Sequence, residues 1–234
     1  MSKPTALITG VGEGTGAALV RRFARGGYKI AMLARNQERL KLLEDEISDS
    51  KAYLCDVGNI DMLLNTVEAV RKDMGDPNVL IHNAVAATFE SFLEADPKDL
   101  EKNFRVNTTS LLYLARELVP AMVEAGQGAI MVTGNTAALR GIPITAVFAP
   151  TKAAQRILSE SLARELGPKG VHVAYITIDA AIDTPWTREP FHPDKSDEFF
   201  SKPHAIADEV FHVAHQDRSA WSFDVIIRPY AEKW

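Results

Sequence analysis

A glycine-rich stretch near the start of the chain limits the possible folds more than any other feature. Residues 9–16 read TGVGEGTG, with the apolar run Ala6-Leu7-Ile8 before them and helical spacing from Ala17 onward. This order predicts a strand, a tight turn and a helix start. Glycines leave the backbone bare for a phosphate to approach, and a helix N-terminus presents N–H donors to it. An ordinary tight turn is the alternative, because such glycine patterns also occur by chance.

The chain alternates short apolar strands with amphipathic helices from this turn to its end. Such alternation predicts an α/β fold with a parallel sheet and helices on both faces. With the glycine turn at the first crossover, the best match is a Rossmann-type doubly wound sheet of about seven strands in the order 3-2-1-4-5-6-7. Strands are expected at residues 6–8, 29–34, 52–55, 79–81, 129–133, 171–178 and 223–227, and helices near 17–23, 37–47, 60–74, 100–125, 149–166 and 205–215.

Composition excludes several other classes of protein. The 234 residues are 46% hydrophobic, which suffices for one sizeable core, so a single domain spanning residues 1–234 is expected. The net charge is −5 without a basic tract, so no nucleic-acid partner is expected. Cys55 alone excludes an intrachain disulfide and fits a reducing compartment. No leader or apolar run of membrane length is seen, so a cytoplasmic protein without membrane or metal is expected.

Residues 183–203 lack any clear period. They hold several prolines together with Trp186, Phe191, Phe199 and Phe200. We interpret the segment as a mobile substrate lid, and a plain surface loop is the alternative. Its aromatic side chains suggest an apolar or aromatic-tolerant pocket, but they could equally pack onto the sheet or a neighbouring subunit.

The end of the second strand carries the signal for the type of dinucleotide. About twenty residues past the glycines, dinucleotide-binding folds place an acid for a free ribose or an arginine for a 2′-phosphate. Here the acid is absent and Arg35 is present, which favours NADP(H) over NAD(H), although Glu13 in the turn would repel a 2′-phosphate. Arg35 could instead be a solvated charge at a helix cap. Asp56, after the third strand, could accept a bond from the adenine amino group or cap a helix.

Taken together, these motifs resemble the short-chain dehydrogenase/reductase family. The resemblance covers about residues 4–230 and rests on the order and spacing of the glycine turn, Cys55-Asp56-Val57, Asn83-Ala84, Asn107 and Lys152. The family implies a single Rossmann-type domain, an NAD(P)(H) cofactor, a small carbonyl or alcohol substrate, and a homodimer or homotetramer.

The resemblance also implies a set of site residues. Asn83 and Ala84 would line the ribose on the nicotinamide side, and Ile182 and Thr184 would meet the nicotinamide carboxamide. The family's catalytic tetrad would fall on Asn107, Asn135, Phe148 and Lys152. The full cofactor set is Gly10, Gly12, Glu13, Gly14, Thr15, Gly16, Arg35, Asp56, Val57, Asn83, Ala84, Lys152, Ile182 and Thr184.

The sequence departs from the family in its chemical half. Phe148 stands where the family has a tyrosine, Asn135 where it has a serine, and His82 precedes Asn83 where an asparagine is usual. Lys152 could hold the ribose and relay a proton through water, and the Asn135 amide could polarise a carbonyl oxygen. Asp179 is a third candidate, at the carboxyl end of a strand.

Each of these residues also has a structural alternative. Asn135 could cap a turn, Asn107 could pack a helix, Lys152 could be a surface charge, and Asp179 could brace a loop.

Three functions therefore compete. The first is an NADP(H)-dependent oxidoreductase of short-chain dehydrogenase type that transfers hydride to a carbonyl or from an alcohol with an altered proton donor, because a missing general acid slows such a reaction without forbidding it. The second is a cofactor-loaded regulator or scaffold that has lost catalysis. The third is an isomerase, dehydratase or lyase on the same fold.

Overall fold

Seven parallel strands form the main sheet of this computed structural model, which describes residues 3–231. The sheet order is β3-β2-β1-β4-β5-β6-β9, which confirms the predicted order; the last strand is β9 because two short strands, β7 and β8, pair separately before it. The strands of the main sheet are β1 Thr5–Thr9, β2 Lys29–Ala34, β3 Ser50–Leu54, β4 Val79–His82, β5 Gly128–Asn135, β6 Val171–Ile178 and β9 Asp224–Ile227.

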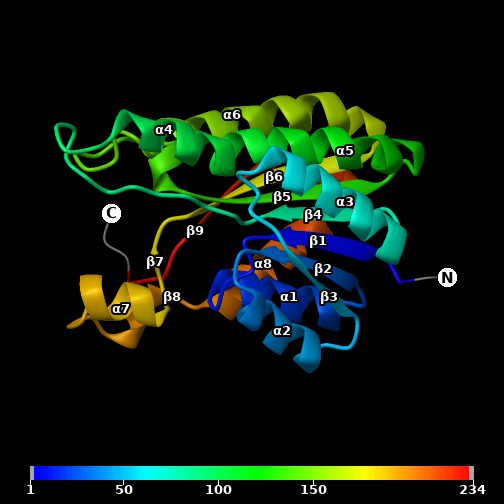
Figure 1. Cartoon of the computed structure of the whole chain (residues 1–234), viewed down its shortest axis with the longest axis horizontal. Helices are drawn as coiled ribbons and strands as arrows, with labels where there is room; N and C mark the ends of the chain where they lie inside the picture. Colours follow the sequence, from blue (N-terminus) through cyan, green and yellow to red (C-terminus); the bar gives the residue numbers. More distant parts are fainter. Residues whose placement is uncertain (1–2, 232–234) are drawn as a thin grey trace.

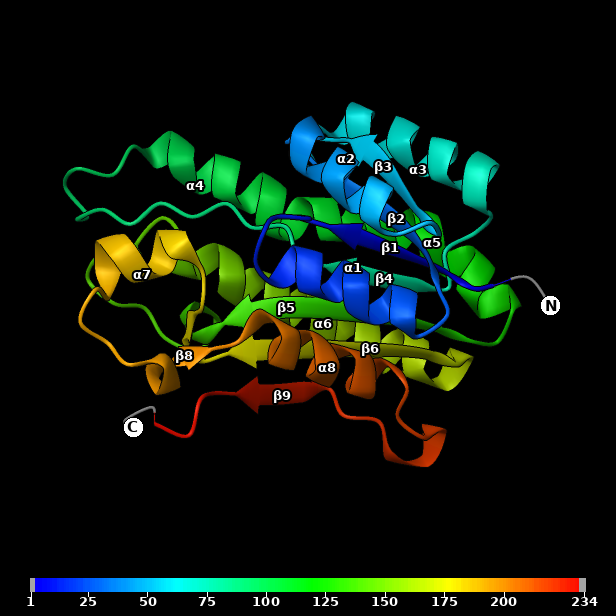
Figure 2. The same cartoon turned by 90° about the horizontal axis from the view of Figure 1, so that it is seen from below.

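Helices cover both faces of this sheet, as predicted (Figure 1). Helices α3, α5 and α6 lie on one face, and α1, α2 and α8 lie on the other, where Figure 2 shows α1 and α8 in front of the strands. Their bounds are α1 Thr15–Arg25, α2 Gln37–Glu46, α3 Ile60–Met74, α4 Pro97–Phe104, α5 Ser110–Glu124, α6 Ala149–Leu166, α7 Pro185–Phe191 and α8 Pro203–Ala214.

Two apolar cores lie on opposite faces of the sheet, because successive side chains of each strand point to opposite faces. On β1, Leu7 packs among the residues of α3 and α5, whereas Ala6 and Ile8 pack among those of α1 and α8. The central strands are therefore mostly apolar, as strands buried on both faces usually are, with polar residues such as Thr9 and His82 at their carboxyl ends. No helix within residues 3–231 is both long enough and apolar enough to cross a membrane.

The long helix predicted over residues 100–125 is interrupted. Helix α4 ends at Phe104, a π-helical segment covers Arg105–Thr109, and α5 begins at Ser110. Helical periodicity could not reveal this, because one wider turn leaves the apolar spacing on either side almost unchanged. Such π segments recur at functional sites, and this one contains Asn107.

The segment after β6 contains regular secondary structure. Strand β7 (Ala181–Ile182) pairs with β8 (Phe200–Ser201), and α7 lies between them. Asp183 binds both Arg188 and Lys202, the latter at 2.6 Å. These ion pairs brace α7 against β8, and the mobility of residues 183–203 stays a prediction.

The topology places a crevice at one edge of the sheet. From β1 the chain crosses to β2 on one side, and β4 returns to the other side of β1. Ligands of open α/β sheets bind where the strand order reverses in this way, beyond the carboxyl ends of the strands. In Figures 1 and 2, α7 and the segment between β4 and α4 extend past this same edge.

Candidate functional site

A cavity of about 1370 Å³ opens at the carboxyl ends of β1 to β4. Its wall contains every residue predicted to hold the cofactor except Lys152, together with residues of α4 and Trp186 of α7. The predicted residues in the wall are Gly10, Gly12, Glu13, Gly14, Thr15, Gly16, Arg35, Asp56, Val57, Asn83, Ala84, Ile182 and Thr184.

The glycine turn brings backbone against backbone at the base of the cavity. Gly10 has φ +70°, and a Cβ there would lie 2.6 Å from the Ala84 nitrogen. A Cβ on Gly16 would lie 2.5 Å from the Gly10 carbonyl oxygen. A side chain at Gly10 or Gly16 would therefore push apart the glycine turn, α1 and the segment after β4. The Thr15 hydroxyl is buried beside this turn and has no hydrogen-bond partner within residues 3–231. A buried hydroxyl without a partner is unfavourable, and a bound phosphate group would supply one.

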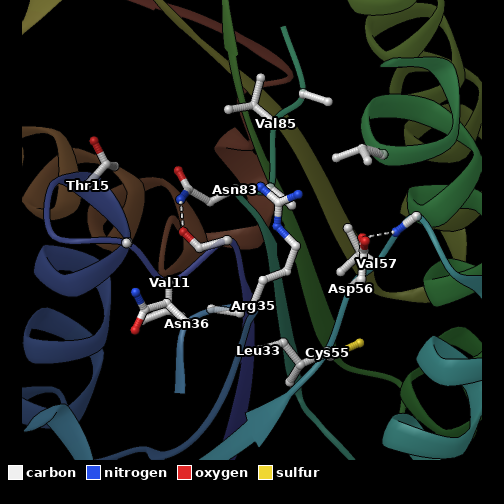
Figure 3. Close-up of a pocket in the computed structure, with 18 of the residues that line it drawn as sticks. Val11, Thr15, Leu33, Arg35, Asn36, Cys55, Asp56, Val57, Asn83 and Val85 are labelled. Atoms are coloured by element: carbon white, nitrogen blue, oxygen red, sulfur yellow. Dashed lines mark hydrogen bonds between the residues drawn. The ribbon is translucent and has the colours of Figure 1, made fainter. Parts of the chain in front are cut away.

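Arg35 reaches from the end of β2 into the cavity. Figure 3 shows its side chain, in this view, between Asn83 on one side and Asp56 and Val57 on the other. Asn36 caps α2 by accepting the Arg39 backbone N–H at 3.0 Å. The helix cap is therefore Asn36, and the Arg35 side chain has no capping role.

The negative charge of the glycine turn is paired. Glu13 meets the Arg39 guanidinium at 3.3 Å, and both residues line the cavity. The repulsion expected between Glu13 and a 2′-phosphate is therefore offset by a neighbouring cation.

Asp56 and Asn83 fix the loops on the opposite wall. Asp56 accepts the Gly58 backbone N–H at 2.9 Å, whereas α3 is capped by Asn59, so the alternative of Asp56 as a helix cap is wrong. Asn83 donates to the Gly10 carbonyl oxygen at 2.9 Å, as Figure 3 shows. That bond ties β4 to the glycine turn.

The four residues predicted for catalysis lie outside the cavity wall. Phe148 is 2% exposed, and its ring packs edge-on against Phe89 with 5.3 Å between centroids. The Asn135 side chain accepts the Ala137 N–H at 3.2 Å, so it does cap a turn. Aromatic packing and turn capping therefore occupy two of the four positions.

Asn107 braces the chain beyond β4. Its side chain accepts the Ala86 N–H at 2.9 Å and donates to the Ala86 carbonyl oxygen at 2.8 Å. It also donates to the Thr151 hydroxyl, at 2.8 Å. Asn107 thus joins the π-helical segment to the cavity wall and to α6.

Lys152 is buried, with 1% of its surface exposed, so the alternative of a surface charge is wrong. Its amine donates to Gln155 Oε1 and, at 3.4 Å, to the Thr133 carbonyl oxygen. Burial lowers the pKa of this amine to about 7. Because an ammonium carries three donors and two have acceptors here, one N–H remains for a ligand.

His82, Asn107 and Lys152 form a buried polar layer behind the cavity wall. No role was predicted from the sequence for His82. Its Nε2 lies 3.3 Å from the Asn107 carbonyl oxygen and its Nδ1 lies 3.1 Å from the Thr9 hydroxyl. Since a carbonyl only accepts, Nε2 carries the hydrogen and Nδ1 accepts from Thr9. Burial, and then the charge of Lys152, lower the pKa of His82 to about 4, so the ring is neutral near pH 7.

Hydrogen bonds connect Lys152 to the cavity. Its amine binds the Thr133 carbonyl oxygen, and the Thr133 hydroxyl donates to Asn83 at 2.9 Å. Asn83 in turn lines the cavity and binds Gly10. Thr133 and Asn83 therefore link the buried amine to Gly10 in the glycine turn.

Asp179 is engaged elsewhere. Its carboxylate lies 3.7 Å from Arg228, in agreement with a loop-bracing role. Within residues 3–231, no group of three or more His, Cys, Asp and Glu side chains is placed to hold a metal ion.

Exposed apolar side chains surround the carboxyl edge of the sheet. They belong to residues 85–93 after β4, residues 139–144 after β5, and α7. The Glu90 N–H donates to the Ile144 carbonyl oxygen at 3.1 Å, which holds the first two segments together. We call this set the apolar rim: Val85, Phe89, Phe92, Leu93, Leu139, Ile142, Ile144, Trp186 and Phe191.

Comparison with protein families and curated proteins gives one consistent result. A family model described as short chain dehydrogenase matches residues 4–194. A Bos taurus protein named Short-chain dehydrogenase/reductase 3 is 33% identical over 167 residues, which are 69% of this chain. This chain spans 55% of the length of that relative. Versicolorin reductase of Emericella nidulans is 30% identical over 173 residues, covering 72% of this chain and 65% of that protein.

Solved structures share the fold over nearly the whole chain. A short-chain dehydrogenase from Rhodopseudomonas palustris is 31% identical, has a TM-score of 0.83, and is matched over 97% of this chain and 99% of its own. A closed form of serine dehydrogenase complexed with NADP+ is 26% identical, has a TM-score of 0.86, and is matched over 98% and 96%.

Proposed function

The chain belongs to the short-chain dehydrogenase family, and we propose that it is an oxidoreductase that interconverts a carbonyl compound and its alcohol with a nicotinamide dinucleotide held in the cavity. The observation that carries this proposal is the cavity itself. One connected space touches the glycine turn, Arg35, Asp56, Asn83 and Thr184, which are the positions that the family resemblance assigns to the cofactor.

We propose NADP(H) as the preferred cofactor. Arg35 has no ion pair or hydrogen bond of its side chain within residues 3–231, and Arg39 neutralises Glu13. An arginine at the end of the second strand suits a 2′-phosphate. The structural neighbour that is complexed with NADP+ agrees with this choice.

The residues present fit such a cofactor. The bare turn and the Thr15 hydroxyl would meet the pyrophosphate, Arg35 the 2′-phosphate, and the remaining N–H of Lys152 a ribose hydroxyl. When bound, NADPH supplies a hydride to a carbonyl carbon while the carbonyl oxygen takes up one proton, which leaves an alcohol and NADP+.

Proton delivery is where this chain would differ from its family. Phe148 takes the place of the family tyrosine and carries no hydroxyl. We assign the proton to Lys152, which would pass it on through water, because an amine with a pKa of about 7 can both hold and release a proton at neutral pH. The Asn135 Nδ2 group would polarise the substrate oxygen, because the turn cap engages only Oδ1.

The apolar rim favours an apolar substrate. Val85 and Trp186 belong both to the rim and to the cavity wall, so a substrate entering there meets apolar side chains first. A rim of this kind contributes affinity by burying apolar surface of the ligand. We therefore propose a bulky apolar ketone, aldehyde or alcohol as the substrate class.

A panel of such carbonyl compounds tests this function. NADPH consumption by the wild-type chain is compared with that of Gly12→Asp, which places a carboxylate beside the expected pyrophosphate. A Cβ on Gly12 meets nothing within 4 Å, so the variant is expected to fold. Consumption that exceeds the Gly12→Asp background supports the oxidoreductase function, and consumption no greater than that background contradicts it. Polar carbonyls are included in the panel, and equal rates on apolar and polar compounds would contradict the apolar substrate class alone.

A cofactor-loaded regulator is the second candidate. The observation in its favour is that Phe148 packs against Phe89 and Asn135 caps a turn, so two predicted catalytic positions have structural roles. This candidate predicts tight NADPH binding without turnover.

Phe148→Tyr separates the two candidates. If Lys152 serves an active site, the added hydroxyl should raise carbonyl reduction by about tenfold or more, toward the 10²–10⁴-fold typical of a general acid. Turnover that stays undetectable while NADPH still binds would favour the regulator.

A further inference from the structure

Gln155 is a fully buried amide one helical turn after Lys152 on α6. Its Oε1 accepts from the Lys152 amine, and its Nε2 donates at 2.5 Å to the carbonyl oxygen of Asn107 in the π-helical segment. The side chain thus joins two of the residues proposed for catalysis. It does not line the cavity.

Both ends of this amide are fixed by their partners. An ammonium group only donates, so it must face the amide oxygen, and a peptide carbonyl only accepts, so it must face the amide nitrogen. The Tyr175 hydroxyl adds a second, longer contact to Gln155 Oε1, at 3.4 Å. Neither an apolar side chain nor a carboxylate could satisfy both partners in this way.

We propose that Gln155 is a positioning residue that holds the Lys152 amine on a neutral oxygen and ties it to the Asn107 carbonyl. This inference rests on the proposed function, in which Lys152 delivers the proton. Gln155 itself would touch neither cofactor nor substrate.

The Gln155 oxygen that accepts from Lys152 is uncharged, and this affects how readily the amine releases its proton. A carboxylate beside a buried amine would hold its proton tightly, whereas an amide oxygen accepts the hydrogen bond without that strong attraction. The titratable groups that face this layer are His82 from β4 and Tyr175 from β6. Burial keeps the imidazole of His82 neutral near pH 7 and raises the pKa of Tyr175, so neither group supplies a counter-charge.

Two substitutions should move Lys152 in opposite directions. Gln155→Glu supplies a carboxylate and should shift the titration midpoint of Lys152 upward by about 1–3 pH units. Gln155→Met keeps an unbranched side chain but removes the strong acceptor, so the midpoint should shift downward. A purely structural role for Gln155 predicts no such opposite pair.

The measurement uses the whole chain without cofactor. Lysine is labelled with ¹³C at Cε, the Lys152 resonance is identified by its loss in Lys152→Met, and its shift is followed against pH. Ser159→Ala is the matched control, because that buried hydroxyl donates to the Gln155 backbone carbonyl at 2.8 Å and is not a partner of the amine.

Opposite shifts in the two Gln155 variants, with the wild-type midpoint retained in Ser159→Ala, support the inference. Equal midpoints in wild type and Gln155→Glu, or a shift in the same direction in both variants, overturn it. If Gln155→Met fails to fold, the Gln155→Glu midpoint decides alone. Because no cofactor or turnover is involved, this result is independent of whether the chain reduces any carbonyl.

Discussion

The cavity wall leaves some of its polar groups without partners, whereas the buried polar layer behind it, which contains Asn107, Lys152 and Gln155, is bound together by hydrogen bonds. On the wall, the Thr15 hydroxyl and the Arg35 guanidinium have no partners within residues 3–231, and the glycine turn exposes bare backbone. Behind it, Asn107, Lys152 and Gln155 are almost completely buried and bind one another or neighbouring backbone.

This difference separates binding from chemistry. Unpaired donors around a preformed space are ready for an anionic ligand, whereas in the packed layer most donors already have acceptors and Lys152 keeps one N–H for a ligand. Substitutions on the wall should therefore change affinity, and substitutions in the buried layer should change proton transfer. The following predictions test that division.

Lys152→Met should produce the largest effect, mainly on the chemistry and to a smaller extent on cofactor binding through the lost ribose contact. Carbonyl reduction is expected to fall about 10²–10⁴-fold, the usual contribution of a general acid. The free energy of unfolding should stay equal or rise, since burying a cation is costly. Turnover measurements and urea denaturation check the two parts. A variant that keeps wild-type turnover would remove Lys152 from the mechanism.

Alkaline pH should stabilise the wild-type fold through the same residue. Lys152 titrates at about 7 when folded and near 10.5 when unfolded. Between these values the unfolded chain binds more protons, so the free energy of unfolding rises with pH, by on the order of a few kcal/mol for this group. Denaturation at several pH values should show this rise, and Lys152→Met should lack it. Identical slopes in the two proteins would contradict the assignment.

Gly10→Ala should destabilise the glycine turn at the base of the cavity and lower the melting temperature. The residue has φ +70° and its Cβ would lie 2.6 Å from the Ala84 nitrogen, so the backbone directly after β4 would have to move. Strain alone costs about 1–3 kcal/mol. Gly12→Ala is the matched control, because a Cβ there meets nothing within 4 Å. Equal melting temperatures for the two variants would show that the close approach is unimportant.

Arg35→Ala should have the smallest and most selective effect. Loss of one charge-assisted contact is expected to weaken NADPH binding about tenfold or more. NADH binding should change little, because NADH lacks the 2′-phosphate. Fluorescence titrations with both nucleotides measure this difference. An equal loss for both would place Arg35 away from the 2′-phosphate.

The fold and the wall were accessible from sequence because local patterns determine them. The glycine turn, Arg35 and Asp56 each follow a strand, and carboxyl ends of parallel strands meet at one edge, so their meeting around a cavity could be anticipated. The buried layer could not be anticipated in this way. His82 and Gln155 meet through the Asn107 carbonyl, and the π-helical turn that presents this carbonyl leaves no periodic signal.

One weak signal for Gln155 was present. A polar residue three positions after Lys152 falls on the buried face of α6, where an apolar residue would be expected. The roles of the catalytic residues, a homodimer or homotetramer and a single domain over residues 1–234 stay predictions, and residues 1–2 and 232–234 of that range lie outside the described residues.

Nucleotide binding by the isolated chain tests the central claim most directly. Wild-type protein is titrated with NADPH and with NADH while intrinsic fluorescence and melting temperature are followed. We predict saturable changes in both signals, with tighter binding of NADPH and a melting temperature that rises with its concentration. Signals that remain constant with both nucleotides would contradict the assignment of the cavity.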